Sequence, residues 1–167
     1  MTQPRAGFLL TRHWRDTPQG SELSFWLATD DGPLQVTLPP QESVAFIPEA
    51  QQAQAEQLLQ GEKGFRFAPL TLRDFHRQPV VGLYCRAHRQ LMRLEKMLRD
   101  SGVTVYEGDI RPPERYLMER FITAPVWVEG ETRGSQLVNA RMKPNPDYRP
   151  PLKWVSLDIE TSRHGEL

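Results

Sequence analysis

Hydrophobic and polar residues alternate along the first forty residues of the chain. Three apolar-rich runs, AGFLLTRHW, LSFWLATD and LQVTLPP, are separated by the turn-forming stretches DTPQGS and DDGP. A period of two residues with short turns is typical of antiparallel strands, and the adjacent prolines Pro39 and Pro40 interrupt backbone pairing. The pattern therefore predicts an antiparallel β meander that ends at Pro39.

Residues 44–108 have a different pattern of hydrophobic and polar positions, in which strand-like and helix-like segments follow one another. SVAFIP is strand-like, EAQQAQAEQLLQ is helix-like up to Gly61, and FRFAPL and VVGLYCR are again strand-like. HRQLMRLEKMLRDS indicates a second helix that stops at Gly102, and VTVYEG indicates a last strand. The order β-α-β-β-α-β predicts a ferredoxin-like unit, in which two helices cover one face of a four-stranded antiparallel sheet. The expected fold class is α+β.

The second of these helices has two distinct faces. Leu91, Leu94 and Leu98 lie at i, i+3 and i+7 and should pack on the sheet. Three basic residues lie on the opposite side of the helix: Arg89, Arg93 and Lys96. We favour a solvated polar face over a dedicated DNA contact for this side.

The remaining chain predicts a short helix, a hairpin and a linker. PPERYLMERF reads as a helix with proline at its start, and VWVEGETRGSQLVNARM reads as a hairpin with its turn near Gly134. The segment KPNPDYRPP at 143–151 has four prolines in nine residues and no apolar period. We therefore expect one domain over 1–151 and the start of another over 152–167.

Charge is distributed unevenly in a chain of zero net charge. Residues 16–62 carry eight acids and no Lys or Arg, whereas 63–99 carry nine Lys or Arg and two acids. This asymmetry fits a basic surface for phosphate, and it fits equally well two oppositely charged segments folded against each other. Zero net charge argues against a generic nucleic-acid coat.

Length and composition limit the classes of protein to which the chain can belong. With 167 residues and 38% apolar residues, the chain can form one core of ordinary size, or one domain and part of another. No apolar run approaches the roughly 18 residues that span a bilayer, and the start lacks the order of a signal peptide. We expect a cytoplasmic protein with no membrane contact.

Neither the cysteine nor the histidines predict a metal or disulfide site. The single Cys85 cannot form an internal disulfide, and we expect it to be a small buried apolar side chain rather than a nucleophile. The four histidines, His13, His76, His88 and His164, have no metal-ligand spacing.

Two carboxylates near the end of the chain, in WVSLDIETS at 154–162, are the candidate catalytic residues. In a strand, Val155 and Leu157 face one side while Asp158 and Glu160 face the other, roughly 6.5–7 Å apart. Such a pair can share two Mg²⁺ ions that activate a water against a phosphodiester. A polar strand edge explains the same residues, and a two-metal site needs further carboxylates, although only seven residues follow Glu160.

WVSLDIETS resembles the first exonuclease motif of family B DNA polymerases, in which a strand carries Asp-Ile-Glu at the start of a proofreading domain. The strings GFLLTRHWRDTPQG, FWLATDDGPLQVTL, DFHRQPVVGLYCRAHRQLM, IRPPERYLMERF and NARMKPNPDYRPPLKWVSLDIET resemble the amino-terminal region of bacterial members of this family. The resemblance covers essentially the whole chain, and strings of this length are far more specific than a three-residue motif.

The resemblance implies a parent enzyme that extends a primer on a DNA template with deoxynucleoside triphosphates and Mg²⁺, together with a sliding clamp. It also implies removal of mismatched 3′ ends and a role in replication restart, repair and damage-tolerant synthesis. Asp158 and Glu160 would be the first metal-binding acids of the 3′-5′ exonuclease, and 152–167 would be the truncated start of its ribonuclease H-like domain. Residues 1–151 would be a scaffold that flanks the single-stranded template.

The later exonuclease acids and the polymerase-site aspartates are missing from this sequence. We therefore expect the fragment itself to be catalytically inert and monomeric, and to bind no metal. We also expect residues 152–167 to be loosely ordered or docked on the preceding domain.

Two other functions remain open. A stand-alone module for single-stranded nucleic acid is suggested by KGFRFAPL at 63–70, where Lys63, Gly64, Phe65 and Phe67 resemble the aromatic signature of RNA-recognition domains. That signature belongs on the third strand of the unit, and this segment is the second, so a core position is favoured for both phenylalanines. The other function is a protein-docking surface on the acidic segment 16–62.

Overall fold

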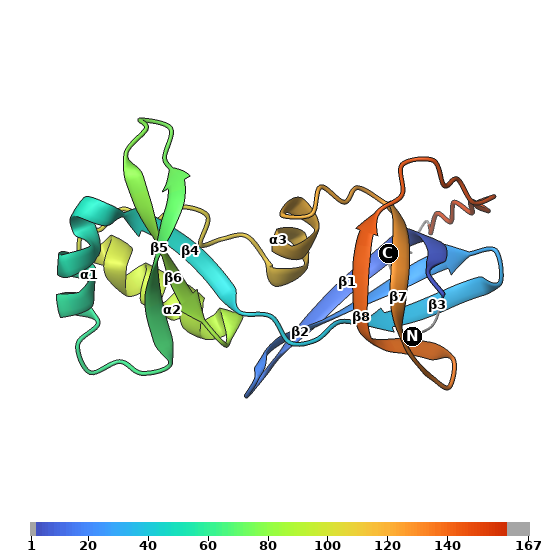
Figure 1. Ribbon diagram of the computed structural model, residues 1–167, viewed down its shortest axis with the longest axis horizontal. Coiled ribbons are helices and arrows are strands. Elements are labelled where there is room, and N and C mark those ends of the chain that lie inside the picture. The colour runs from blue at the N-terminus through green and yellow to red at the C-terminus, as the bar shows by residue number, and fades with distance from the viewer. Residues whose placement is uncertain (1–2, 160–167) are drawn as a thin grey trace, which may run out of the picture.

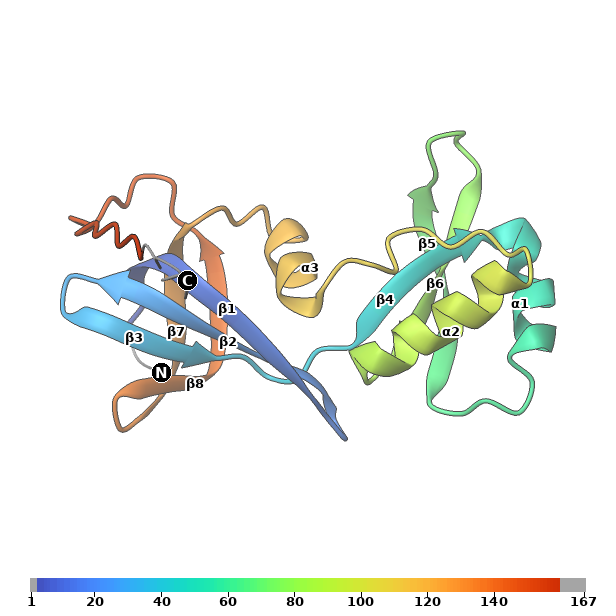
Figure 2. The same ribbon diagram turned by 180° about the vertical axis from the view of Figure 1, so that it is seen from behind.

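The molecule consists of two lobes with a short helix between them, and the computed structural model describes residues 3–159 (Figures 1 and 2). One lobe is a barrel of five strands: β1 (Arg5–Thr17), β2 (Gly20–Thr29), β3 (Gly32–Thr37), β7 (Pro125–Arg133) and β8 (Gln136–Pro144). The other contains β4 (Ser43–Pro48), the short 3-10 helix η1 (Glu49–Gln51), α1 (Gln52–Leu58), β5 (Phe65–Arg73), β6 (Pro79–Cys85) and α2 (His88–Asp100). Helix α3 (Pro112–Met118) lies between the lobes.

The predicted meander of the first forty residues is confirmed. β1, β2 and β3 pair in antiparallel order, and alternate residues of β2, namely Leu23, Phe25 and Leu27, are buried inside the barrel. The barrel closes because β7 pairs with β1, while β8 pairs in parallel with β3. The predicted hairpin of β7 and β8 is also confirmed, with Gly134 in the turn at φ +60°. Residues 43–111, which precede α3, therefore form an insertion that leaves the barrel after β3.

The second lobe is a three-stranded antiparallel sheet in the order β4-β6-β5, with α1 and α2 on one face. Leu91, Leu94 and Leu98 are buried against that face, as the period of α2 predicts. Gly102 has φ +83°, a left-handed conformation that ends the helix where the sequence indicates. The core of this lobe is separate from that of the barrel.

The predicted four-stranded ferredoxin-like sheet is not confirmed. The segment VTVYEG contributes one isolated antiparallel bridge, between Tyr106 and Phe46 of β4, in place of a fourth strand. Glu107 directly after the bridge has φ +56°. This left-handed backbone cannot continue an extended strand, so the chain turns away toward α3.

The predicted helix at PPERYLMERF is confirmed as α3, with prolines in its first turn. Tyr116 belongs to the core of the barrel and Leu117 packs against it, while Glu114 pairs with Arg12 of β1 at 2.7 Å. α3 therefore covers one end of the barrel. No helix within residues 3–159 is long and apolar enough to span a membrane.

The proline-rich segment 143–151 begins inside the barrel sheet, because β8 extends to Pro144. Asn145 is buried and its N–H donates to the Pro125 carbonyl, while the Tyr148 hydroxyl donates to Asp30 at 3.0 Å. The first half of the expected linker is thus held against the barrel.

The strand expected at 154–160, as the first strand of a ribonuclease H-like domain, is absent from residues 152–159. Val155, Leu157 and Ile159 are 80–88% exposed in an irregular segment. A strand needs hydrogen-bonding partners and a covered apolar face, and the described residues supply neither. Glu160 and the residues after it lie outside the described range.

Candidate nucleic-acid interface

Asp158 is the only one of the two predicted catalytic acids that can be placed, because Glu160 lies outside the described residues. Its side chain is exposed in the irregular segment. No group of three or more His, Cys, Asp or Glu within residues 3–159 could hold a metal ion. A hard cation such as Mg²⁺ requires several converging oxygens, so these residues do not by themselves fit the Mg²⁺ that the family resemblance implies.

The aromatic residues that resemble an RNA-recognition signature lie in the core. Phe65 and Phe67 of β5 pack against the hydrophobic cluster under the helices, with their rings 5.8 Å apart in an edge-to-face arrangement. They face the helices, so they do not form a stacking platform on the open face of the sheet. Both phenylalanines pack against the core, as predicted, although each is only partly buried. Cys85 is buried as well, and burial raises the pKa of its thiol to about 12, as expected for an unreactive side chain.

Part of the charge asymmetry is accounted for by ion pairs within the molecule. Glu42 and Glu62, from the acidic segment, pair with Arg66 and Arg93, from the basic segment, each at 2.5 Å. On the exposed face of α2, Lys96 pairs with Asp100 at 2.7 Å. The two oppositely charged segments therefore do fold against each other, and little of the basic face of α2 remains for phosphate.

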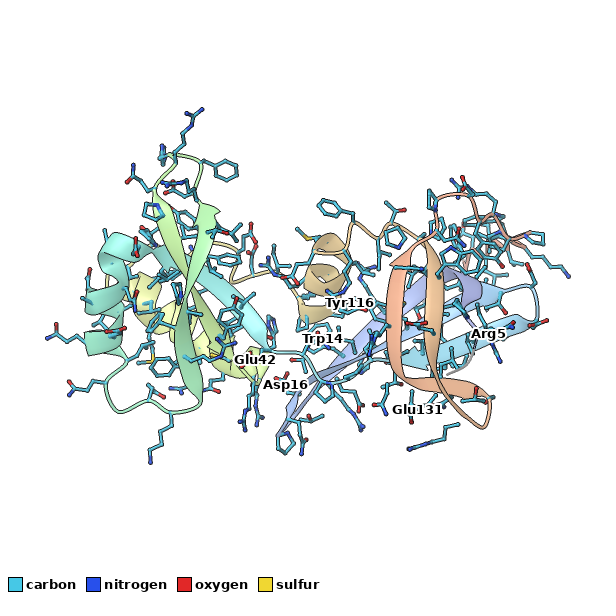
Figure 3. The ribbon with its side chains drawn as sticks, viewed as in Figure 1. Arg5, Trp14, Asp16, Glu42, Tyr116 and Glu131 are labelled. Atoms are coloured by element: carbon cyan, nitrogen blue, oxygen red, sulfur yellow. The ribbon has the colours of Figure 1, made fainter. Side chains whose placement is uncertain are left out.

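The tip of the β1–β2 hairpin contacts the second lobe through Asp16, which lies with Trp14 and Glu42 at the junction (Figure 3). α2 has Ala87 before its first residue and no side-chain cap of its own. The Asp16 carboxylate accepts hydrogen bonds from the backbone N–H of His88 and of Arg89, both at 3.0 Å. A residue of the barrel thus caps a helix of the other lobe.

The junction shifts the pKa of both groups that meet there. Partial burial alone would raise the pKa of Asp16, but the N–H groups of Arg89 and His88 and the hydroxyl of Ser21 outweigh it and lower the pKa. Burial lowers the pKa of His88, whose ring lies edge-on to Trp14 at 5.9 Å. The buried Nδ1 of His88 has no hydrogen-bond partner among the described residues.

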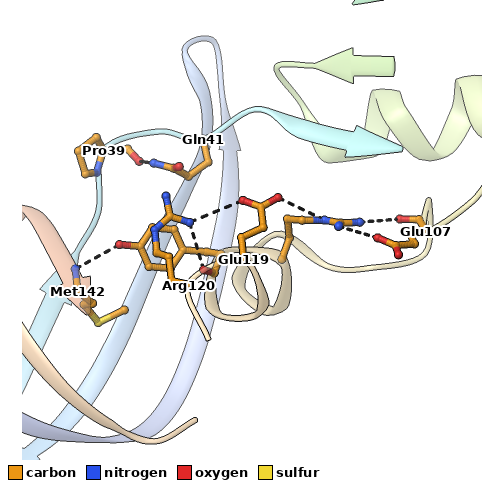
Figure 4. Close-up of polar contacts among 8 residues, drawn as sticks. Pro39, Gln41, Glu107, Glu119, Arg120 and Met142 are labelled. Atoms are coloured by element: carbon orange, nitrogen blue, oxygen red, sulfur yellow. Dashed lines mark hydrogen bonds and ion pairs between the residues drawn. The ribbon is translucent and has the colours of Figure 1, made fainter. Parts of the chain in front are cut away.

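α3 carries a chain of polar contacts from one lobe to the other (Figure 4). The Met142 N–H in β8 donates to the Tyr116 hydroxyl at 3.2 Å, and Arg120 donates to the Tyr116 carbonyl. Arg115 pairs with Glu107 at 2.7 Å on the side of the second lobe. The two lobes are therefore joined by α3 as well as by the Asp16 cap.

The outer face of the β7–β8 hairpin holds a groove of about 230 Å³ that the sequence analysis did not identify. Val126 and Val128 point into the barrel, so Trp127 points outward and is 38% exposed. Lys143 of β8 lies directly opposite Trp127 in the ladder, and Arg141 lies opposite Glu129.

The local sequence explains this register. β7 and β8 shift their pairing between Glu129 and Glu131, where Gly130 approaches the facing strand so closely that a Cβ would lie 2.9 Å from the Val138 carbonyl oxygen. The extra residue lies in β8, where Asn139, at φ +50°, and Ala140 both oppose Gly130. This bulge fixes which side chains face each other. Alternation of Trp127 with buried valines was the available signal, but the pairing with Lys143 depends on this bulge.

The sequence of the chain is similar to known DNA polymerase II sequences. Residues 7–42 match the family described as DNA polymerase II, N-terminal, and residues 43–103 match DNA polymerase II, insertion domain. The division between them falls where the chain leaves the barrel and enters β4. The chain is also 76% identical over 163 residues to DNA polymerase II of Escherichia coli (strain K12), an alignment that covers 98% of this chain and 21% of that protein.

Among solved structures, the fold is similar to the family B DNA polymerase from the hyperthermophilic archaeon Pyrobaculum calidifontis. The TM-score is 0.66 at 18% identity, and the match covers 88% of this chain and 21% of that one. The fold is therefore one that occurs in family B DNA polymerases. The chain belongs to the DNA polymerase II family and contains its N-terminal and insertion domains. It spans about a fifth of the length of either relative.

Proposed function

We propose that this chain is the amino-terminal, template-side scaffold of a DNA-directed DNA polymerase with 3′-5′ proofreading exonuclease. The single observation that carries the proposal is 76% identity over 98% of the chain to DNA polymerase II of E. coli. The whole protein would extend a primer on a DNA template with deoxynucleoside triphosphates and a sliding clamp. It would act in the cytoplasm in replication restart, repair and damage-tolerant synthesis.

Within this proposal, residues 1–151 form the amino-terminal domain and 152–167 begin the exonuclease domain. The unit at 44–108 would be a ferredoxin-like arrangement with a reduced fourth strand. Two features support this: the order β4-β6-β5, and the bridge that places Tyr106 beside Phe46 at the free edge of β4. The scaffold alone is proposed to be a monomer.

Asp158 and Glu160 are proposed to bind Mg²⁺ once the later exonuclease acids are present. Mg²⁺ would supply an activated water and stabilise the departing oxygen, while these two carboxylates would hold the metal. Because the described residues contain no group of three or more possible ligands, the chain alone is proposed to be inert.

The test uses the whole protein that the gene encodes, including any residues beyond Leu167. Asp158→Ala with Glu160→Ala should lower 3′-5′ exonuclease activity by roughly 100-fold or more, because metal ligands are lost, and primer extension should persist. Asp147→Ala, an exposed acid of the linker, is the control and should change neither activity. Full exonuclease activity in the double variant would rule out the proposed role of the two acids.

A further inference from the structure

The groove on the outer face of β7 and β8 combines one exposed aromatic ring with two cations. It is lined by Pro4, Trp127, Val128, Glu129, Arg141, Met142 and Lys143. We propose that this groove binds single-stranded DNA, with one base stacked on Trp127 and the neighbouring phosphates at Arg141 and Lys143. This inference adds a DNA-binding site to the proposed function. It depends on the proposed function only for the choice of DNA over RNA as the ligand.

The aromatic part of the argument comes from a comparison of two tryptophans on the same barrel. Trp26 on β2 is 44% exposed and Trp127 is 38% exposed, so exposure does not distinguish them. Trp26 lies between Thr11 and Gln35 in the sheet, whereas Trp127 lies directly opposite Lys143. A base stacked on Trp127 would therefore have a cation beside it for its phosphate, and a base on Trp26 would not.

The cations are available for a ligand. Neither Arg141 nor Lys143 forms an ion pair with another residue in the range 3–159, whereas Arg66, Arg93 and Arg99 of the second lobe are each paired with a glutamate. The two side chains are alternate residues of β8, so they project from the same face. Glu129 lines the same groove opposite Arg141 and opposes the binding of an anion.

The geometry favours a single strand over a duplex. A groove of about 230 Å³ accepts a group of the size of one base, and stacking on an aromatic ring requires a base whose face is uncovered. A duplex hides those faces and is instead recognised by many phosphate contacts. The zero net charge of the chain provides no such general attraction.

The direct test is fluorescence anisotropy of a labelled oligothymidylate of about 8–12 nucleotides, titrated with the full 167-residue chain at low salt. Trp127→Ala should weaken binding by roughly 5- to 150-fold, the loss expected for one stacked base. Trp26→Ala is the matched control and should stay within about twofold of the parent chain. Trp127→Phe retains an aromatic face and should recover most of the affinity.

The charged residues provide a second measurement that does not require Trp127 to be changed. Lys143→Gln and Arg141→Gln should each reduce the slope of log Kd against log salt by about 0.7, as expected for one phosphate contact on a single strand. Glu129→Gln removes the opposing charge and should tighten binding by roughly 1.5- to 5-fold. Circular dichroism of each variant confirms that it is folded.

Three outcomes would overturn the inference: no saturable binding up to about 100 µM chain, equal losses for Trp127→Ala and Trp26→Ala, or an unchanged salt slope in both cation variants. Equal affinity of the parent chain for a duplex of the same sequence would also contradict stacking. Failure here would leave the exonuclease test of the whole protein untouched, because that test does not involve the groove.

Discussion

Asp16 of the barrel makes a direct contact with the second lobe. Its carboxylate accepts two backbone N–H groups at the start of α2 and the hydroxyl of Ser21. The first N–H groups of a helix have no partner within the helix, so a carboxylate placed there satisfies them and interacts favourably with the helix dipole. Asp16 thus stabilises α2 and fixes the barrel against it at once.

We predict that Asp16→Ala lowers the free energy of unfolding by about 1–2 kcal/mol, the usual cost of a lost N-cap. Asp16→Asn should lose less, because an amide oxygen still accepts one N–H. Asp31→Ala is the matched control, because this exposed carboxylate in the β2–β3 turn forms no hydrogen bond or ion pair within residues 3–159. Urea denaturation measures all three, and equal stability of Asp16→Ala and Asp31→Ala would show that the cap is unimportant.

His88 makes the junction sensitive to pH. Burial lowers its pKa, and Arg111 acts in the same direction, while Asp16, Glu95 and Glu114 act in the opposite one. Because the folded-state pKa lies below the unfolded value of about 6.5, the unfolded chain binds more protons in that range. The contribution is fully present above about pH 6.5 and is lost as the pH falls through the folded-state pKa.

The melting temperature should therefore fall as the pH is lowered below about 6.5. In His88→Phe, which keeps a ring beside Trp14 but cannot take up a proton, this dependence should flatten. His13→Gln, on the exposed side of β1, should retain the dependence of the parent chain. Thermal unfolding followed by circular dichroism measures this dependence. An identical slope of melting temperature against pH in His88→Phe and the parent chain would exclude His88 as its source.

At the scale of elements, Tyr116 attaches α3 to the barrel. Its hydroxyl accepts the Met142 N–H inside the barrel, and its ring lies 3.8 Å below the Arg120 guanidinium carbon. We predict that Tyr116→Phe costs about 1–2 kcal/mol of barrel stability, because the buried Met142 N–H is left without a partner. Tyr148→Phe, which removes an exposed hydrogen bond to Asp30, should cost below about 0.5 kcal/mol. Comparable losses in chemical denaturation would contradict the assigned role of Tyr116.

The elements that could be predicted from sequence are those determined by residues close together in the chain. α2 follows from the spacing of Leu91, Leu94 and Leu98 and from Gly102, and the β7–β8 hairpin follows from alternation and Gly134. Closure of the barrel could not be predicted, because the parallel pairing of β3 with β8 joins segments about a hundred residues apart. The fourth strand was wrongly predicted for a different reason. Val103 and Val105 alternate with polar residues as in a strand, but the Thr104 N–H donates to the side chain of Gln51, so only Tyr106 pairs with β4.

The same distinction between local and long-range causes applies to the candidate functional residues. The motif at Asp158 and Glu160 was visible in the sequence because it is contiguous, yet residues 3–159 assemble no metal site from it. The groove at Trp127 is assembled across two strands by a bulge of β8 opposite Gly130, so the same residues did not stand out in the sequence. Alternation along one strand predicts the hairpin, but it does not indicate the bulge that places Lys143 opposite Trp127.

At the scale of the whole molecule, the second lobe is inserted into the barrel between β3 and α3 and is held by the contacts at Asp16 and α3. The segment 152–159 follows the barrel with its apolar side chains exposed. The same residues would form a buried strand only if further chain supplied neighbouring strands. This explains why an apolar run of strand-like sequence has no strand structure here.

Amide hydrogen exchange should show this contrast directly. In the dilute chain, Val155, Leu157 and Ile159 should exchange near unprotected rates, whereas Val126 and Val128, buried in the barrel, should be strongly protected. In a protein that continues past Leu167 with the missing strands, protection at 155–159 should appear. Strong protection of 155–159 in the dilute 167-residue chain would mean that the segment is already docked.

The central claim, that this chain is the amino-terminal region of a DNA polymerase, is tested most directly by primer extension with the whole protein that the gene encodes. On a primed single-stranded template with Mg²⁺ and deoxynucleoside triphosphates, it should lengthen the primer and trim a mismatched 3′ end before doing so. The 167-residue chain alone should do neither. Absence of both activities in the folded whole protein, under conditions where a DNA polymerase II control is active, would contradict the claim.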